Sequence, residues 1–453
     1  MATSPAPTSE DERLPMLLGF QRVADNRAQN TSFIERGRGI YVYDTDGREY
    51  IEATASFYVA ALGYQHEELI DAIAAQYREL PFYVSALQRT SKASLDLAEK
   101  LREILPVPDP HILFAVTGSE ANDFLIKMLH FQAVARGTPT RRTIIGRYDS
   151  YAGGTLAAAS LTGGHHAEFG LPLAGFLHVS QPDYHGAREP GESETEYSAR
   201  LGAELNALIA GQPEASVAAF FAEPVSFSAG LMVPPADYFA NAGRVLKQHG
   251  VSFVADEVIT GFGRTGSLFG CETFGLKPDH CATAKAITGG YFPLSAIALG
   301  RELYADLEAG SDAVGVLAHA ATHAAHPVGA AAALKTIEII ERDGLVAHAA
   351  RVGEHLGRRL HALSGHPLVG HVRHVGLAGA VDFLCRDRHD VPVNHDAEAV
   401  AGRVYENMLK AGVVVRLTGR SIVIAPPLII TESEIDEICD RLLRALDASI
   451  DLG

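Results

Sequence analysis

The feature that most constrains the fold is an alternation of short apolar runs with longer amphipathic patterns between about residues 112 and 300. The apolar runs have the length of buried strands; they read HILFAV, RRTIIG, AAFFAEPV, VSFVADEV and SAIALG. Helical periodicity appears between them, in ANDFLIKMLHFQAVA and ADYFANAGRVLKQHG. Strands that alternate with helices predict an α/β fold with a mostly parallel sheet covered by helices.

The segment before this region has a different texture. Residues 40–54 predict a β-hairpin, because Asp46 and Gly47 supply a turn between two alternating runs. Residues 66–79 and 92–104 have the periodicity of amphipathic helices.

Past about residue 330 the texture changes again. An Ala-rich helix ends at Gly344, and short strands and a helix near 395–411 follow it. The runs GVVVRL and SIVIAPPL predict two strands around Thr418-Gly419. Thr431 with Glu434 predicts a capping box for a last helix. We therefore expect a smaller α+β domain here.

The chain has 453 residues, which is too long for one compact core. We expect an N-terminal segment (1–65) that contributes to the small domain, a large domain (66–325) and a C-terminal small domain (326–453).

Charge and composition exclude several classes of protein. A formal net charge of -17 argues against nucleic acid or an anionic membrane as partner, because phosphate contacts need a basic face. No apolar run approaches the roughly 18 residues that a membrane span needs. The start, MATSPAPTSEDERLP, does not resemble a targeting peptide. The four cysteines lack metal-ligand spacing, so we expect a reducing cytoplasm; they are Cys271, Cys281, Cys385 and Cys439.

The stretch ADEVITGFGRTG (255–266) contains G-x-G-x-x-G after an apolar strand pattern. A dinucleotide-binding turn needs these glycines directly after the strand and at the start of a helix. Here Asp256 and Glu257 intervene, and the following SLFGCETFGLKPDH is a poor helix. A carboxylate at this position would also repel a pyrophosphate. An NAD-dependent dehydrogenase would rest on this motif alone, and we reject it.

A buried carboxylate at the carboxyl end of a strand is suited to a cationic ligand. Pyridoxal phosphate (PLP) is one such ligand, since an Asp holds its ring nitrogen protonated and a Lys forms its Schiff base. Lys285 follows Asp256 in the chain, in the apolar setting ATAKAI. Burial there favours the neutral amine. A cofactor-free scaffold or binding protein would have no need of both residues.

The segment Thr117-Gly118-Ser119 follows one predicted strand and opens a helix. Backbone N–H groups, two hydroxyls and a positive helix end can hold a phosphate there. The alternative is ordinary helix capping.

Together these motifs resemble the class III (subgroup II) aminotransferases over residues 30–447. The matching motifs are VTGSEAND, AEPV, ADEVITGFGRTG, AKAITGGYFPLSA, HAATHAAHPVGAAAAL and RLTGRSIVIAPPL. These are PLP enzymes of fold type I, the aspartate aminotransferase-like fold. The resemblance implies a large domain with a mostly parallel seven-stranded sheet and a smaller α+β domain. Within the family the chain looks most like the ω-transaminases.

The resemblance implies roles for four residues around the cofactor ring. Lys285 would carry the cofactor and move the proton, and Asp256 would pair with the pyridine nitrogen. Val258 would pack on one face of the ring; in an extended segment it would point to the same side as Asp256. Tyr151 would stack on the other face. The family usually has Tyr-His-Gly here, but in this chain Ala152 follows Tyr151, so the bracing of this loop is open.

The resemblance also implies a phosphate site at Gly118 and Ser119, with Thr117 nearby. Glu223, in AEPV, would lie close to Asp256 or to the O3′ side of the cofactor. Taken alone, a Glu before Pro is more often a surface acid at a strand end.

His319, His323 and His326 have a spacing that could place three imidazoles on one helical face, as in a zinc site. Pro327 follows, and the residue before a proline avoids helix, so we expect a loop and no metal. By resemblance Thr322 in this loop reaches the phosphate of a partner subunit. That would make the enzyme a homodimer with sites at the interface, or a dimer of dimers.

For the substrate, the resemblance assigns Arg416 to a carboxylate, and a planar guanidinium suits bidentate binding. Arg420 is a nearby rival. Tyr58 stands where relatives often have Trp and would line the pocket, with Phe57 and Tyr83 as further candidates.

The function implied is ping-pong transamination from an amine or ω-amino acid to a 2-oxo acid, with pyruvate as the expected acceptor. Two alternatives remain open at this point. One is a 2-oxoglutarate-dependent ω-amino-acid aminotransferase. The other is a PLP aminomutase or racemase on the same scaffold, since fold does not fix reaction.

Overall fold

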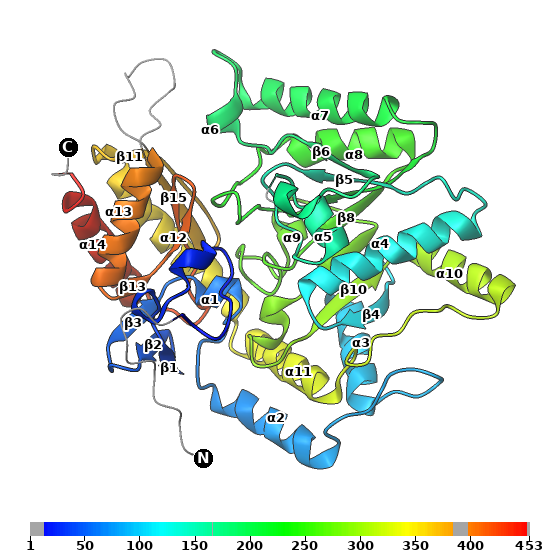
Figure 1. Ribbon diagram of the computed structural model, residues 1–453, viewed down its shortest axis with the longest axis horizontal. Helices are drawn as coiled ribbons and strands as arrows, with labels where there is room; N and C mark the ends of the chain where they lie inside the picture. The colour runs from blue at the N-terminus through cyan, green and yellow to red at the C-terminus, as the bar shows by residue number, and fades with distance from the viewer. Residues whose placement is uncertain (1–12, 165, 384–396, 451–453) are drawn as a thin grey trace.

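The computed structural model describes residues 13–164, 166–383 and 397–450. Its centre is a seven-stranded sheet, as expected for fold type I (Figure 1). Six strands run parallel and β10 runs antiparallel to both of its neighbours. The strands in order across the sheet are β4 (His111–Ala115), β10 (Ser295–Leu299), β9 (His280–Thr283), β8 (Ser252–Asp256), β7 (Val217–Ala222), β5 (Thr143–Arg147) and β6 (Phe176–Val179).

Helices cover both faces of this sheet. Successive residues of β7 alternate between the two faces, because strand side chains have a period of two. Phe221 packs with α4 (Gly118–Ala135) and α10 (Arg301–Val314), whereas Phe220 packs with α7 (Glu194–Ala210) and α8 (Tyr238–His249). The predicted helix-covered parallel sheet is therefore confirmed.

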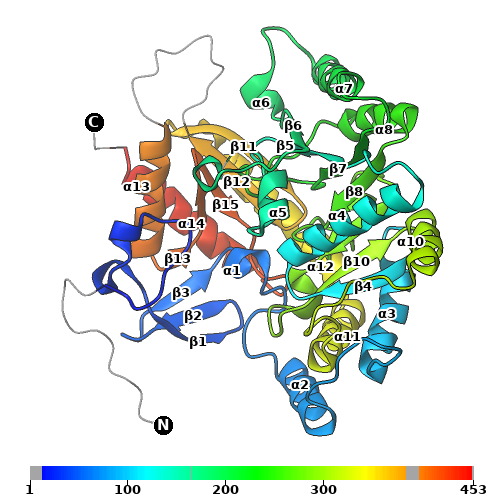
Figure 2. The same ribbon diagram turned by 45° about the vertical axis from the view of Figure 1, so that its right-hand side comes forward.

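The first and last parts of the chain share a second layer. In the sheet β1-β2-β3-β13, β3 pairs in parallel with β13. Figures 1 and 2 both show the blue N-terminal strands beside the orange and red C-terminal helices. A further sheet has the order β11-β12-β15-β14. These strands are β1 (Ile34–Arg38), β2 (Tyr41–Asp44), β3 (Glu49–Glu52), β11 (Val369–Val375), β12 (Ala378–Phe383), β13 (Val413–Val414), β14 (Arg416–Thr418) and β15 (Ser421–Ile424).

The run GVVVRL is not the single strand that we predicted. It divides into β13, which pairs with β3, and β14, which pairs with β15 in the other sheet. Val415 between them is the point where the chain changes sheets. An apolar run has the same sequence pattern whether it stays in one sheet or crosses to another.

The helices predicted at 66–79, at 92–104, near 395–411 and after Thr431 are present, whereas α10 and α12 (Leu345–His361) were not predicted. The predicted hairpin at 40–54 is formed by β2 and β3, and the predicted capping box at Thr431 is present. The remaining longer helices are α2 (Glu67–Glu79), α3 (Lys92–Ile104), α11 (Pro327–Arg342), α12 (Leu345–His361), α13 (Ala397–Lys410) and α14 (Glu432–Asp447). The short ones are α1 (Ala55–Tyr58), α5 (Leu156–Leu161), α6 (Tyr184–Ala187) and α9 (Gly270–Thr273), and the 3₁₀ turns are η1 (Val23–Asp25), η2 (Ala28–Asn30), η3 (Ala167–Phe169), η4 (Lys285–Thr288) and η5 (Ala362–Gly365).

Within the described residues, no helix combines the length and the apolar character that a membrane crossing requires. The domain limits at 65/66 and 325/326 stay a prediction. Cys385 lies outside the described residues, and the other three cysteines are buried free thiols.

Candidate active site

Two neighbouring parallel strands bring Asp256 and Lys285 to the same edge of the sheet. Asp256 is the last residue of β8 and is paired with Ala282 of β9. Lys285 follows β9 after one residue and opens η4. Its φ of 49° is in the left-handed region, which is unfavourable for a residue with a side chain. Ligands in open α/β sheets bind outside this carboxyl edge.

Asp256 is a buried carboxylate held by two hydrogen bonds. Asn122 Nδ2 donates to its Oδ2 (2.9 Å) and the Val258 N–H donates to its Oδ1 (3.1 Å). Burial raises its pKa, while the two hydrogen bonds and the nearby charges of Lys285 and Arg147 act in the opposite direction. Neutral donors orient this carboxylate, and it is suited to accept a hydrogen bond from a protonated nitrogen of a ligand.

Lys285 has a lowered pKa. Burial lowers the pKa of its amine from 10.5 to about 8, and the nearby carboxylates of Asp256 and Glu223 oppose that shift. A substantial fraction of the amine is therefore neutral near physiological pH, which is the form that attacks a carbonyl carbon.

Glu223 follows β7 and is buried, so it is not the surface acid that a Glu-Pro pair usually gives. It forms an ion pair with Arg147 (3.2 Å) and accepts the Tyr151 N–H (3.3 Å). Arg147 Nη2 also donates to the Glu223 carbonyl oxygen (2.7 Å). Burial raises the pKa of Glu223 to about 6; Arg147 lowers it and Asp256 raises it.

The amino end of α4 lies at the same edge of the sheet. Thr117 is its N-cap and forms a capping box with Glu120. The alternative of ordinary capping therefore holds for Thr117, and it leaves the N–H groups of Gly118 and Ser119 free of intrahelical partners. A Cβ on Gly118 would lie 3.0 Å from a methyl group of Val258, so any side chain here would crowd the place where these two segments meet.

Val258 does not lie in an extended segment, so our geometric reason for its orientation was wrong. The chain turns directly after β8, and the Val258 N–H folds back onto the Asp256 carboxylate. Its methyl groups lie against Gly118. It still lies beside Asp256, but the turn places it there.

The loop of Tyr151 is braced without the usual imidazole. The Ala152 N–H donates to Thr162 Oγ1 (2.8 Å), and its carbonyl oxygen accepts from Asn122 Nδ2 (2.8 Å). The Gly154 N–H donates to Ser119 Oγ (3.0 Å). Asn122 thus connects this loop to Asp256, and no motif in the sequence pointed to that role.

The glycines of GFGRTG serve packing between elements. A Cβ on Gly263 would lie 3.2 Å from Leu428, and one on Gly266 would lie 3.2 Å from Ala350. The segment is a series of turns that opens no helix, which agrees with the rejection of a dinucleotide site. Glu257 is fully buried and accepts the N–H groups of Gly270 (3.0 Å) and Cys271 (2.6 Å), so it holds this loop.

The histidine cluster is a loop, as predicted from Pro327. His319 packs against the ring of Phe124, with centroids 4.4 Å apart, and His326 caps the amino end of α11. No group of three metal-ligating side chains occurs among the residues that the structure describes. Thr322 is exposed on the surface of the single chain.

Arg416 lies on β14 above two aromatic rings. Its guanidinium carbon is 4.6 Å from the ring centroid of Phe57 and 5.5 Å from that of Phe20. In the described part of the chain, no carboxylate pairs with it. Burial raises the pKa values of Tyr58 and Tyr151, and the charge of Arg416 opposes both shifts, so Arg416 faces the same space as the Tyr151 loop.

The rival Arg420 is engaged elsewhere. It lies 3.4 Å from a carboxylate oxygen of Asp382 and 3.8 Å from one of Asp183.

Tyr58 is nearly buried, and its ring packs edge-on against Phe227 (4.9 Å between centroids). It belongs to α1, where residues Ala55 to Tyr58 all have positive φ, between 48° and 68°. A left-handed turn of four non-glycine residues is strained, at about 1–2 kcal/mol each. Phe57 projects from this turn to Arg416, while Phe20 reaches it from the N-terminal segment. Sequence patterns did not single out Phe20.

A cavity of about 880 Å³ lies elsewhere, at the opposite edge of the sheet, between α4, α8 and the start of α10. Its lining includes Ser252, His280 and Gly300, and none of the predicted site residues. The size of a cavity alone therefore does not identify the active site.

The residues at the carboxyl edge fit PLP. They supply a buried carboxylate for a protonated ring nitrogen, an amine with a pKa of about 8, and unpaired N–H groups at a helix amino end for a phosphate. In addition, Asn122 Oδ1 is a buried acceptor for which the described residues offer no donor.

Comparison with known proteins points the same way. The family model described as aminotransferase class-III matches residues 23–446. The chain is 36% identical to gamma-aminobutyrate transaminase 1 of Oryza sativa subsp. japonica over 420 residues, which cover 92% of this chain and 81% of that one.

Two solved structures are similar along the whole chain. The omega transaminase from Pseudomonas jessenii in complex with PMP has a TM-score of 0.93 at 38% identity, covering 96% of each chain. The PMP-bound aminotransferase from Vibrio fluvialis has a TM-score of 0.94 at 35% identity, covering 98% of this chain and 99% of that one.

Proposed function

The chain belongs to the class-III aminotransferases, which use PLP, and we propose that it moves an amino group from an amine or ω-amino acid to pyruvate. The observation that carries this proposal is the arrangement of Lys285 and Asp256 on adjacent strand ends, with Glu223 acting on the same amine. The donor class is inferred from the similar proteins, which include a gamma-aminobutyrate transaminase, a vanillin aminotransferase and ω-transaminases.

Each residue has a defined task in this proposal. PLP, when bound, supplies an electrophilic carbon and an electron sink. Asp256 would hold its ring nitrogen protonated, and the N–H groups of Gly118 and Ser119 would hold its phosphate, with Thr117 shaping the turn. Val258 and Tyr151 would enclose the ring.

Lys285 Nζ would take up the proton that leaves the donor carbon bearing the nitrogen and would release it again later in the same half-reaction. Its low pKa supports this role, because a base must be partly unprotonated at the working pH. The charge of Arg147 keeps Glu223 near Asp256 at a tolerable electrostatic cost. Lys285→Ala should abolish turnover.

Arg416 would bind the carboxylate of the acceptor or of an ω-amino acid, in a pocket lined by Tyr58, Phe57 and Phe20. Its contacts with rings, and with no acid of the described chain, leave the guanidinium available for a substrate. A 2-oxoglutarate-dependent enzyme needs a cation for a second carboxylate. Arg420 on the same hairpin already lies against the carboxylates of Asp382 and Asp183, so it is engaged and does not supply that cation. This favours pyruvate as the acceptor.

The test is acceptor preference with one amine donor. The proposal predicts a higher kcat/KM for pyruvate than for 2-oxoglutarate. In Arg416→Ala it predicts a lower kcat/KM for both acceptors, because both carry the carboxylate that Arg416 would bind. Preference for 2-oxoglutarate would instead support the first alternative. Amino-group migration or racemisation without an acceptor would support an aminomutase or racemase.

The active assembly in this proposal is a homodimer, or a dimer of dimers, with Thr322 serving the partner's phosphate site. Large apolar side chains are exposed beside the 319–326 loop, which favours coverage by a second copy. Val316, three residues before the loop, is 61% exposed, and the ring of Phe82, which is 40% exposed, lies 5.5 Å from that of His323. Buried free thiols at Cys271, Cys281 and Cys439 are consistent with the cytoplasm as its compartment.

A further inference from the structure

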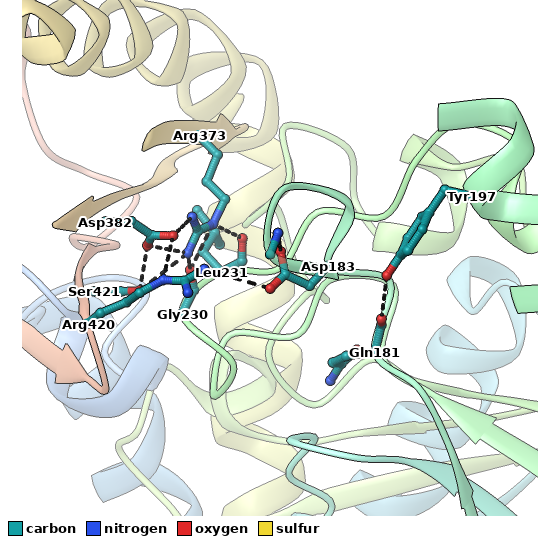
Figure 3. A network of polar contacts seen from close by, with 10 residues as sticks. Gln181, Asp183, Tyr197, Gly230, Leu231, Arg373, Asp382, Arg420 and Ser421 are labelled. Carbon is teal, nitrogen blue, oxygen red and sulfur yellow. Dashed lines mark hydrogen bonds and ion pairs between the residues drawn. The ribbon is translucent and has the colours of Figure 1, made fainter. Parts of the chain in front are cut away.

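A buried polar network connects the sheet that carries Arg416 to two loops of the large domain (Figure 3). Its centre is Asp382 on β12, whose side chain is only 3% exposed. Arg373 of β11 binds it through two contacts of 2.8 Å, a bidentate pair. Ser421 Oγ donates to Asp382 Oδ1 (2.6 Å), and Arg420 Nε lies 3.4 Å from its Oδ2. The charge of Arg373 lowers the pKa of Asp382, so it is ionised at neutral pH.

Arg373 extends the network to the loop of residues 226–232. Its Nε donates to the carbonyl oxygens of Gly230 (3.0 Å) and Leu231 (2.9 Å). Leu231 has a φ of 62°, an unfavourable conformation that persists only where its surroundings hold it. A Cβ on Gly230 would lie 2.7 Å from Ser421 Oγ, so the loop and the hairpin approach too closely for any side chain there.

The same loop begins beside the proposed cofactor site. Ser226 and Met232 exchange two backbone hydrogen bonds, of 3.1 and 2.7 Å, which close its base. The Ser226 hydroxyl accepts from Gln181 Nε2 (3.2 Å), and Ser226 lies three residues after Glu223 in the chain. The network therefore reaches the segment that carries Glu223, a carboxylate that acts on Lys285.

At its other end the network holds the hairpin of β14 and β15. Arg420 and Ser421 form the turn side of this hairpin, and Arg416 lies across from Val423. β14 is an edge strand, paired only with β15 in the described sheet. The Arg416 guanidinium contacts the rings of Phe20 and Phe57, which do not fix a planar cation as a carboxylate would. Its position therefore depends on the hairpin.

We propose that Asp382 is a positioning residue for substrate-carboxylate recognition. Through Arg373, Arg420 and Ser421 it fixes the β14–β15 hairpin against the 226–232 loop, so that Arg416 is held at a set distance from the cofactor side of the site. This inference rests on the proposed function, in which Arg416 binds the carboxylate. Asp382 itself touches no reacting atom.

The test compares substrates with and without a carboxylate, in the holoenzyme. For Asp382→Asn we expect the KM for pyruvate and for β-alanine to rise about tenfold. A change of this size corresponds to the loss of one charge-assisted hydrogen bond between Arg416 and the substrate carboxylate. The KM and kcat for a benzylic amine without a carboxylate should stay within about twofold, because that donor does not use Arg416. A merely structural role would weaken both classes together.

Matched variants keep the test decisive. Asp440→Asn removes a carboxylate that pairs with Arg359 on α12, in the same domain but away from the hairpin, and should change neither class. Arg373→Lys and Ser421→Ala are milder changes in the network and should raise only the carboxylate KM values. They also replace Asp382→Asn if that chain does not fold.

The outcomes separate the two levels of the proposal. If Arg416→Ala discriminates between the classes but the Asp382, Arg373 and Ser421 variants do not, the positioning role is wrong and the proposed function stands. Equal losses for both classes in these variants would also overturn the positioning role. If Arg416→Ala itself fails to discriminate, the proposed function is wrong at that residue, and the inference fails with it.

Discussion

At the scale of single residues, the low pKa of Lys285 comes from its surroundings. The chain places Lys285 in a half-buried position after β9, and desolvation of its amine outweighs the stabilising charges of Asp256 and Glu223. The order of these effects gives a direct prediction for the chain without its cofactor.

We expect acetic anhydride to label Lys285 in the cofactor-free chain with a rate that rises tenfold per pH unit up to about pH 8 and then levels off. Only the neutral amine reacts, so the rate is proportional to the neutral fraction of Lys285, which rises with pH until the pH reaches the pKa of about 8. Mass spectrometry of the labelled peptide measures this rate. A midpoint near 10.5, the ordinary value for lysine, would contradict the account.

The ion pair between Arg147 and Glu223 gives a stability prediction. Both side chains are buried, so Glu223→Ala leaves an uncompensated guanidinium and should cost roughly 3–5 kcal/mol of unfolding free energy. Denaturant unfolding of the cofactor-free chain measures the loss. Glu432→Ala, which breaks the exposed pair with Arg351, is the control and should cost at most about 1 kcal/mol. Similar losses in the two variants would contradict the burial argument.

The sequence could predict residues that belong to a motif and could not predict their supports. Asp256 and Lys285 are recognisable because each stands at a strand end in a typical pattern. Asn122 lies in the motif VTGSEAND and Phe20 lies in none, but the role of neither could be predicted, since these roles arise only when distant segments meet. Val258 was predicted in the right place for the wrong reason, because a turn cannot be distinguished from an extended residue in EVITG.

At the scale of elements, the amino end of α4 combines two functions that its sequence alone did not separate. The capping box of Thr117 and Glu120 stabilises the helix, as in α7 and α14. The same turn presents free N–H groups toward the proposed phosphate site.

We therefore expect Thr117→Ala to lower both the unfolding free energy, by about 1 kcal/mol, and the affinity for PLP. Ser193→Ala removes the equivalent cap from α7 and should lower the unfolding free energy by a similar amount while leaving PLP affinity unchanged. Unfolding curves and equilibrium dialysis measure the two effects. Equal PLP affinity in both variants would contradict the assignment of the phosphate site to the amino end of α4.

Periodicity predicted most elements, and it failed where an element changes partner. The positions of α2, α3 and five of the large-sheet strands follow from amphipathic patterns and apolar runs, whereas β6 and β9 were not predicted. The break between β13 and β14 does not, because both halves are equally apolar. The left-handed turn of α1 was equally inaccessible, since ASFY has none of the glycines that such a conformation favours.

At the scale of the whole molecule, the question is whether one chain forms a complete site. Thr322 is exposed in the single chain, and exposed apolar side chains lie nearby. Our account assigns Thr322 to the site of a second copy.

Mixed dimers test this assignment. A dimer of one Lys285→Ala chain and one Thr322→Ala chain should contain one intact site, because the first chain supplies Thr322 to the Lys285 of the second. We expect activity from the mixture well above that of either variant alone, measured after co-refolding. No rescue would place Thr322 in the site of its own chain.

The central claim is that Lys285 carries PLP and exchanges it with a donor amine. The most direct measurement is the absorption spectrum of the purified holoenzyme before and after addition of a donor amine, and again after addition of pyruvate. The account predicts that the absorbance of lysine-bound cofactor disappears with the amine and returns with pyruvate, and that Lys285→Ala shows neither change. A spectrum that no amine alters, or an exchange that survives in Lys285→Ala, would contradict it.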